Sequence, residues 1–195
     1  FDTQIPGDEK EYFIVIVLDR SGSMDPTRYN SNGSGSPTKI QVATSAVARF
    51  AVACEDLGID VAVVDFYDDT ARLAKPASVD AEFAQEALLN TDAGGGTPLS
   101  DALTLATSLS EMDSKESIII TMTDGKPRDV DATAEVIKQS SAPVCSLTVA
   151  TDCEPGNPPE RAAELEPHFD QTTTVFDPEK LDDRLDQFAA LLGMY

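Results

Sequence analysis

Three oxygen-bearing side chains, Asp19, Ser21 and Ser23, alternate along residues 19–23. The residues directly before them, 12–18, are apolar and end at this turn, as is typical of a buried strand in a parallel sheet. Open α/β sheets build their ligand sites just past the carboxyl ends of such strands. A carboxylate and two hydroxyls converging there suit a hard divalent cation better than a nucleophile. The segment therefore predicts a metal site, with Arg20 pointing outward and without a role.

Two later segments place similar oxygen donors at similar locations. Thr97 ends a triple-glycine loop that opens a predicted helix at 100–111. A second apolar strand, predicted at 117–122, runs into Thr123-Asp124-Gly125. A hydroxyl and a carboxylate thus fall again in loops that precede a helix or follow a strand, where ligand sites form.

The order Asp-x-Ser-x-Ser, then a loop threonine, then Thr-Asp-Gly resembles the metal-ion-dependent adhesion site of von Willebrand factor type A domains. The resemblance covers essentially the whole chain and implies a metal site formed by Asp19, Ser21, Ser23, Thr97 and Asp124. It implies direct ligands that are poor in negative charge, with the two aspartates binding directly or through coordinated waters. A bound Mg²⁺, or Mn²⁺ or Ca²⁺, would then stay electrophilic and take a Glu or Asp carboxylate from a partner protein.

Hydrophobic periodicity places these motifs among alternating strands and helices. It predicts strands at 12–18, 59–66, 70–74, 117–122, 144–150 and 172–176, and helices at 38–57, 80–89, 100–111, 131–139, 160–166 and 181–192. The alternation indicates a doubly wound, mostly parallel, six-stranded Rossmann-like α/β sheet with one short antiparallel edge strand and helices on both faces. We expect residues 1–195 to form a single type A-like domain excised from a longer protein.

Two further segments bear on this site. The stretch 25–37, rich in Ser, Asn and Gly, predicts a loop beside the metal. The amphipathic last helix is a candidate for an element that moves when affinity switches, as in some type A domains.

The charge of the chain restricts its partners. Its 35 acidic and 14 basic residues give a formal net charge of −21. Nucleic-acid binding through phosphate contacts is therefore excluded, and no segment has the length and apolarity that a bilayer requires. The acidity is spread along the chain, which favours adaptation to high salt over a merely acidic domain. The three cysteines, Cys54, Cys145 and Cys153, form neither a disulfide framework nor a metal-ligand spacing.

Each candidate ligand also has a simpler interpretation. Asp19 and Ser21 are suited to capping the next segment, Thr97 to an N-cap followed by proline, and Asp124 to a turn before glycine. These interpretations stay open for each residue alone, whereas three such loops at one rim favour a shared site.

The sequence favours a binding module over an enzyme. Haloacid-dehalogenase-like phosphatases use a first-strand aspartate as nucleophile and need a second carboxylate two residues later, where this chain has Ser21. A metal-dependent phosphohydrolase is therefore a remote alternative. The single histidine, His168, has no evident serine or carboxylate partner, so we expect a non-catalytic protein.

The prediction of where the domain works depends on the loop 94–99. This loop is similar to one in the type A domains of magnesium and cobalt chelatase subunits and of proteins that work beside AAA+ ATPases. There, the site is thought to grip an acidic residue of a partner subunit. Without a disulfide pattern, this favours an intracellular multi-subunit assembly, with a surface or extracellular adhesion module as the alternative. The compartment, with a lean towards the cytoplasm, and the oligomeric state are not fixed by the sequence.

Overall fold

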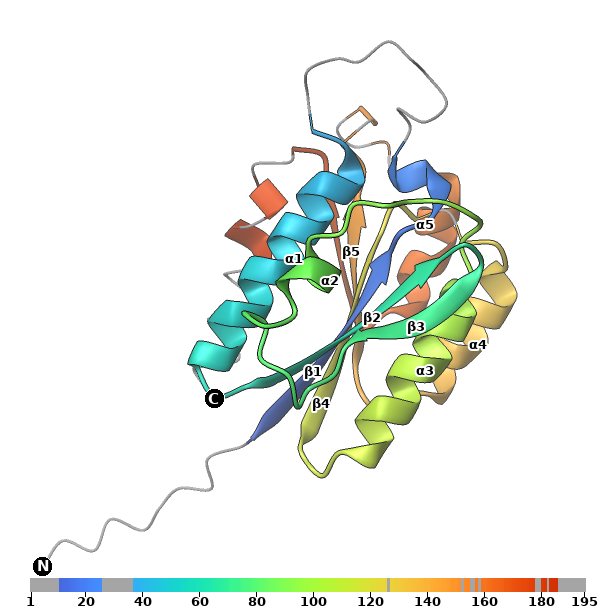
Figure 1. Cartoon of the computed structure of the whole chain (residues 1–195). Coiled ribbons are helices and arrows are strands. Elements are labelled where there is room, and N and C mark those ends of the chain that lie inside the picture. The colour runs from blue at the N-terminus through green and yellow to red at the C-terminus, as the bar shows by residue number, and fades with distance from the viewer. Residues whose placement is uncertain are drawn as a thin grey trace, which may run out of the picture.

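The computed structural model describes residues 11–25, 37–125, 127–151, 153–154, 157, 159–177, 180–181 and 183–185. Within them, six strands form one sheet in the order β3-β2-β1-β4-β5-β6 (Figure 1). The strands are β1 (Tyr12–Asp19), β2 (Asp60–Tyr67), β3 (Thr70–Lys75), β4 (Glu116–Thr123), β5 (Val144–Val149) and β6 (Gln171–Val175). All neighbouring strands are parallel except β2 and β3, which form an antiparallel pair at one edge. The predicted α/β sheet is therefore confirmed.

Helices cover both faces of this sheet. One face packs against α1 (Lys39–Asp56) and α2 (Gln85–Leu88). The other face packs against α3 (Leu99–Met112), α4 (Val130–Gln139) and α5 (Glu160–Leu165). A single turn of 3-10 helix, η1 (Gly22–Met24), follows β1, and another, η3 (Glu166–His168), follows α5.

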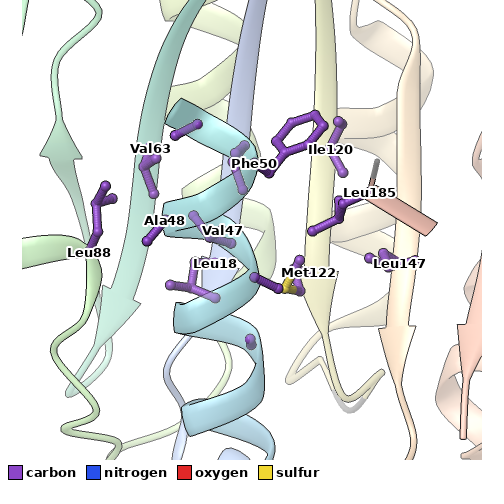
Figure 2. Close-up of a cluster of buried hydrophobic side chains, with 14 of the residues drawn as sticks. Leu18, Val47, Ala48, Phe50, Val63, Leu88, Ile120, Met122, Leu147 and Leu185 are labelled. Atoms are coloured by element: carbon purple, nitrogen blue, oxygen red, sulfur yellow. The ribbon is translucent and has the colours of Figure 1, made fainter. Parts of the chain in front are cut away.

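The central strand β1 divides its side chains between two cores. Ile14, Ile16 and Leu18 belong to the core beneath α1, which Figure 2 shows around Val47 and Phe50. The alternate residues of the strand, Phe13, Val15 and Val17, belong to the core beneath α3. Because both faces are covered, β1 is apolar throughout, and its first polar side chain, Asp19, comes at the rim.

Local signals define where α1 begins and ends. Thr38 and Gln41 form a capping box at its N-terminus, in which each side chain accepts a hydrogen bond from the other's backbone N–H. Gly58, with a φ of 77°, follows the C-terminus. The helix predicted at 38–57 is therefore found with nearly the same bounds.

The helix predicted at 80–89 is mostly wrong, because only α2 is helical there. The Ala81 backbone N–H donates to the Glu55 carboxylate of α1 at 2.7 Å, and residues 81–84 form turns. Phe83 is largely exposed, so the apolar residues of this segment do not all face the core. Hydrophobic spacing without a capping signal overestimated the helix.

Two predicted segments lie mainly outside the described residues. Of the predicted loop 25–37, residues 26–36 are not described, and neither is the predicted last helix beyond residue 185. Its described residues are helical, and Leu181 and Leu185 are buried in the core beneath α1. Among the helices described, none combines the length and apolarity needed to cross a membrane.

Candidate metal centre

Two aspartates leave the sheet side by side, one from each of two neighbouring strands. Asp19 is the last residue of β1, and Asp124 directly follows β4. The parallel register pairs Leu18 with Met122, so both carboxylates reach the same rim. Both residues are fully buried, which is unusual for a carboxylate and requires strong compensating interactions.

The Asp19 carboxylate is held by hydrogen bonds at both oxygens. Oδ1 accepts from the Ser21 backbone N–H at 2.8 Å, and Oδ2 accepts from the Thr123 hydroxyl at 2.6 Å. The Thr123 hydroxyl in turn accepts from the Gly125 backbone N–H at 3.1 Å. Thr123 therefore belongs to the site, although the sequence did not lead us to assign it. It directly precedes Asp124 in the Thr-Asp-Gly motif.

The electrostatics of the rim disfavour two ionised carboxylates. The pKa of Asp19 is raised from 3.8 to about 6, first by burial and second by the nearby charge of Asp124. The hydrogen bonds from Ser21 and Thr123 act in the opposite direction. A cation between the two carboxylates would relieve this repulsion, so the rim is suited electrostatically to a positive ion.

The two serines of the motif lie against each other. Ser21 is buried at the start of η1, and its Oγ lies 3.1 Å from the Ser23 Oγ. The Ser21 side chain makes no capping hydrogen bond to η1. The capping interpretation of Ser21 is therefore wrong, and its hydroxyl faces the second serine of the motif.

The glycine loop is fastened to the motif by backbone hydrogen bonds. Gly94 donates to the Arg20 carbonyl at 2.9 Å, and Gly22 donates to the Gly95 carbonyl at 3.2 Å. Gly95 has a φ of 71°, and a Cβ on it would lie 2.6 Å from the Asp68 Cα. Only glycine fits this close approach, which draws the loop carrying Thr97 towards the Asp19 rim.

Thr97 does not act as a helix cap. Pro98 occupies the N-cap position of α3, without a side-chain cap hydrogen bond. The Thr97 carbonyl accepts from the Arg128 backbone N–H at 3.0 Å, which joins the loop to the segment after β4. Among the described residues, no hydrogen bond links the Thr97 side chain to the other predicted ligands. The backbone of its loop makes the contacts to them.

Lys39 is a further residue of this rim, and the sequence interpretation did not assign it. It begins α1, and its Nζ lies 3.2 Å from the Asp124 Oδ2. The lysine is 2% exposed and the aspartate 0%. The pair joins the N-terminus of α1 to the end of β4, and no local sequence signal indicates it because 85 positions separate the two residues.

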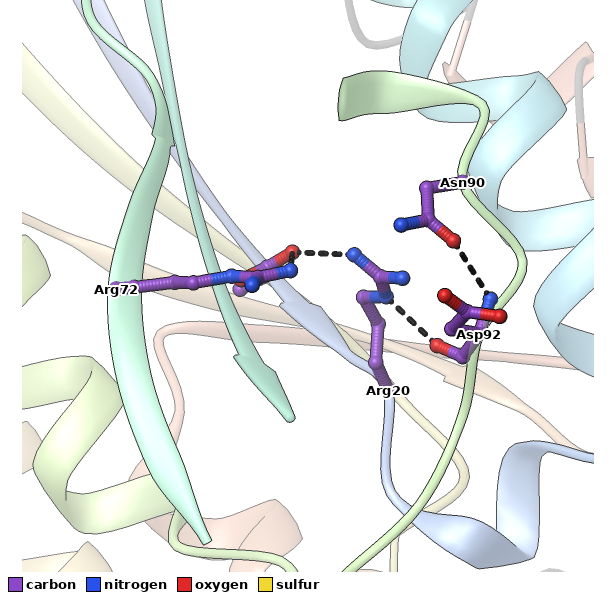
Figure 3. Close-up of polar contacts among 5 residues, drawn as sticks. Arg20, Arg72, Asn90 and Asp92 are labelled. Atoms are coloured by element: carbon purple, nitrogen blue, oxygen red, sulfur yellow. Dashed lines mark hydrogen bonds and ion pairs between the residues drawn. The ribbon is translucent and has the colours of Figure 1, made fainter. Parts of the chain in front are cut away.

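The prediction for Arg20 is wrong, because this side chain is buried. Figure 3 shows its guanidinium between β2 and the loop before the glycines. Nη1 donates to the Asp65 Oδ2 at 2.7 Å, and Nε donates to the Asp92 carbonyl at 2.9 Å. Arg72 of β3 donates to the same Asp65 carboxylate at 2.6 Å. Arg20 lies inside because Asp65, in the middle of an apolar strand, supplies its counter-charge.

The donor set fits a hard divalent cation and does not fit a softer metal. Within the described part of the chain, no cluster of three or more His, Cys, Asp or Glu side chains could hold a metal ion. The rim instead combines two buried carboxylates with hydroxyls, and oxygen donors of this kind suit Mg²⁺, Mn²⁺ or Ca²⁺.

This fold, with a polar rim after β1 and β4, defines the class of the protein. A family model described as the von Willebrand factor type A domain matches residues 14–126, more than half of the chain. The chain therefore belongs to the von Willebrand factor type A domain family, which confirms the predicted family, whereas the metal site stays a prediction. No curated protein matches the chain.

Solved structures similar to this chain include two pilus proteins. The PilB minor pilin from Streptococcus sanguinis is 13% identical with a TM-score of 0.76, over 97% of this chain and 62% of that one. The pilus adhesin SpaC from Lactobacillus rhamnosus GG is 16% identical with a TM-score of 0.73, over 96% of this chain and 31% of that one. The chain thus spans less than two thirds of either protein, and at these identities the likeness shows the fold alone.

A third similar structure contains a metal. The manganese-loaded TRAP protein from Plasmodium vivax is 15% identical with a TM-score of 0.58, over 92% of this chain and 74% of that one. This likeness also concerns the fold.

Proposed function

We propose that this domain is a non-catalytic module that binds a partner protein through a divalent cation. The Ser21, Ser23 and Thr97 hydroxyls would hold the ion, with Asp19 and Asp124 binding directly or through water. The observation that carries the proposal is the buried pair of carboxylates at one rim, in which burial and the neighbouring charge raise the pKa of Asp19. Mg²⁺ is the first candidate, and Mn²⁺ and Ca²⁺ are the others.

The chemistry of the ligands suggests what the bound ion would do. Neutral hydroxyls leave more positive charge on the cation than carboxylates do. A Glu or Asp carboxylate of the partner would complete its coordination. A protein with a net charge of −21 would in this way bind an acidic surface, because the cation bridges two negative groups.

The described residues give little support to an enzyme. Burial raises the pKa of Cys54 to about 12 and that of Cys145 to about 11, which makes both thiols poor nucleophiles. His168 is exposed, on η3. Ser21 still occupies the position where a phosphatase would need its second carboxylate.

Two settings are compatible with such a module. Similarity in fold to a minor pilin and to a pilus adhesin supports adhesion at a cell surface. The loop 94–99, with its likeness to chelatase and AAA+-associated domains, supports an intracellular assembly. Both settings require the same metal–carboxylate contact, so the metal is tested first.

The test is a calorimetric titration of metal-stripped protein with Mg²⁺ and Mn²⁺ in high salt. The variant Asp19→Ala/Ser21→Ala should lose saturable one-site binding that the wild-type protein shows. A matched control, Asp131→Ala/Ser108→Ala, makes the same chemical change on exposed helix positions and should bind as the wild type does. Absence of binding in the wild type, or equal binding in the first variant, would overturn the proposal.

A further inference from the structure

The candidate metal centre contains a built-in cation. The Lys39 Nζ lies 3.2 Å from the Asp124 Oδ2, and both side chains are almost completely buried. Transfer of an ammonium group from water into a protein interior is costly unless the group is paired and hydrogen-bonded. A lysine at this position therefore requires the carboxylate, and it adds a positive charge beside the proposed ion.

The charges of the rim can be counted with and without this lysine. The two carboxylates carry two negative charges and Lys39 one positive charge, whereas the serine and threonine hydroxyls are neutral. Lys39 therefore makes the centre one unit more positive, with or without a divalent cation. Without the lysine, the loaded centre would be one unit more negative, and its attraction for an anionic group would be weaker.

The lysine also holds Asp124 in place. Its bond engages one carboxylate oxygen and connects the first residue of α1 to the residue after β4. The Lys39 ammonium thereby orients the Asp124 side chain in the metal-free protein as well.

We infer that Lys39 is a positioning residue that sets the charge of the loaded centre, lowering its affinity for the metal while raising its affinity for a carboxylate. The inference rests on the proposed metal-dependent function. One buried side chain would thus set the balance between the affinity of the site for the metal and the affinity of the bound metal for a partner carboxylate. A centre tuned in this way binds its cation less tightly than its ligands would allow.

The variant Lys39→Met tests this directly, because it keeps the length and the apolar stem of the side chain. Titration of the metal-stripped variant with Mg²⁺ should show binding about tenfold tighter than in the wild type. Acetate, used as the carboxylate probe, should bind the Mn²⁺-loaded variant several-fold more weakly, as followed by water-proton relaxation. Added Mg²⁺ should also raise the melting temperature of this variant by more than it raises that of the wild type.

Two other variants separate charge from structure. Lys39→Arg retains the positive charge and should restore both wild-type affinities. Lys75→Met removes another fully buried lysine, which bonds the Val61 carbonyl and Glu55, and should reduce stability without changing Mg²⁺ affinity.

The outcomes are distinct. Unchanged or weaker Mg²⁺ binding by Lys39→Met, beside a wild type that binds, would overturn the inference and leave the metal site standing. Equal tightening in Lys75→Met would also overturn it, because the effect would then belong to the total charge. A wild type that binds no metal would overturn the proposed function and this inference together.

Discussion

Asp19 and Arg20 are consecutive residues, yet they belong to two different buried charge clusters. The Asp19 cluster consists of Asp19, Asp124 and Lys39, two acids and one base. The Arg20 cluster consists of Arg20, Asp65 and Arg72, two bases and one acid. The two clusters stabilise their buried carboxylates differently.

The Arg20 cluster satisfies its acid within the protein. Asp65 accepts hydrogen bonds from Arg20 Nη1 and from Arg72 Nε and Nη2. Arg72 is half exposed, so water solvates part of its charge, and both guanidinium groups lie about 6 Å from the Tyr67 ring centroid. This cluster fastens β1 to the edge of the sheet and has a structural role.

The Asp19 cluster leaves negative charge buried. Its two carboxylates are completely buried, Asp124 is paired with the Lys39 ammonium, and the pKa of Asp19 is raised. Perturbed, buried carboxylates gather at functional sites more often than at structural ones. The comparison indicates that the Asp19 cluster destabilises the fold, whereas the Arg20 cluster stabilises it.

The largest expected effect is at the Arg20 cluster. Asp65→Asn keeps the shape of the side chain but leaves two arginines without their buried counter-charge, and it should lower the free energy of unfolding by about 3–5 kcal/mol. Urea denaturation would measure this. Asp60→Asn is the control, since its partly exposed pair with Lys115 should contribute less than about 1 kcal/mol. Equal effects of the two variants would contradict a structural role for Asp65.

At the Asp19 cluster, removing a buried negative charge is expected to increase the free energy of unfolding. Because the folded-state pKa of Asp19 lies near 6 and its ordinary value is 3.8, the folded protein binds a proton more tightly than the unfolded chain does. Stability is therefore lost as the pH rises from about 4 to about 6, and the penalty persists at neutral pH. Asp19→Asn should make the metal-free protein about 1–3 kcal/mol more stable at neutral pH.

Denaturation of the wild type and of Asp19→Asn between pH 4 and pH 8 would check the direction of this stability change. The two stability curves should converge at about pH 4, separate between about pH 4 and about pH 6, and stay apart at higher pH. Curves that stay parallel would mean that Asp19 ionises normally in the fold.

The smallest effect should come from the exposed arm of the Arg20 cluster. Arg72→Met removes a half-exposed partner while Arg20 still pairs with Asp65, so the loss should be about 1 kcal/mol. Thermal denaturation at low and high salt would measure it. A loss as large as that for Asp65→Asn would place the energy of the cluster in its exposed arm instead.

Much of the fold could be predicted because its signals are local. Apolar runs such as 12–18 predicted the strands, and the alternation of strands with helices predicted the layered sheet that the structure has. The helix predicted at 80–89 is wrong because hydrophobic spacing does not show that Glu55, far along the chain, accepts a hydrogen bond from the Ala81 backbone N–H. The conformation at the start of this segment therefore depends on a contact between distant parts of the chain.

The candidate site was predicted in part for the same reason. Loops at strand ends were visible in the motifs, so Asp19 and Asp124 were expected at one rim, where the structure places them. Lys39 and Arg20 were not assigned because their partners are far along the chain. A charged residue within the apolar strand β2, Asp65, was the available signal that a buried arginine lay nearby.

The hydrogen bonds at Thr123 provide this protein with a built-in spectroscopic reporter. The Gly125 amide donates to the Thr123 hydroxyl, which donates to the Asp19 carboxylate. Hydrogen bonds linked in this way polarise one another, so any change of charge on Asp19 reaches the amide through a single oxygen. The nitrogen and proton chemical shifts of Gly125 can therefore follow the ionisation of a side chain that solvent does not touch.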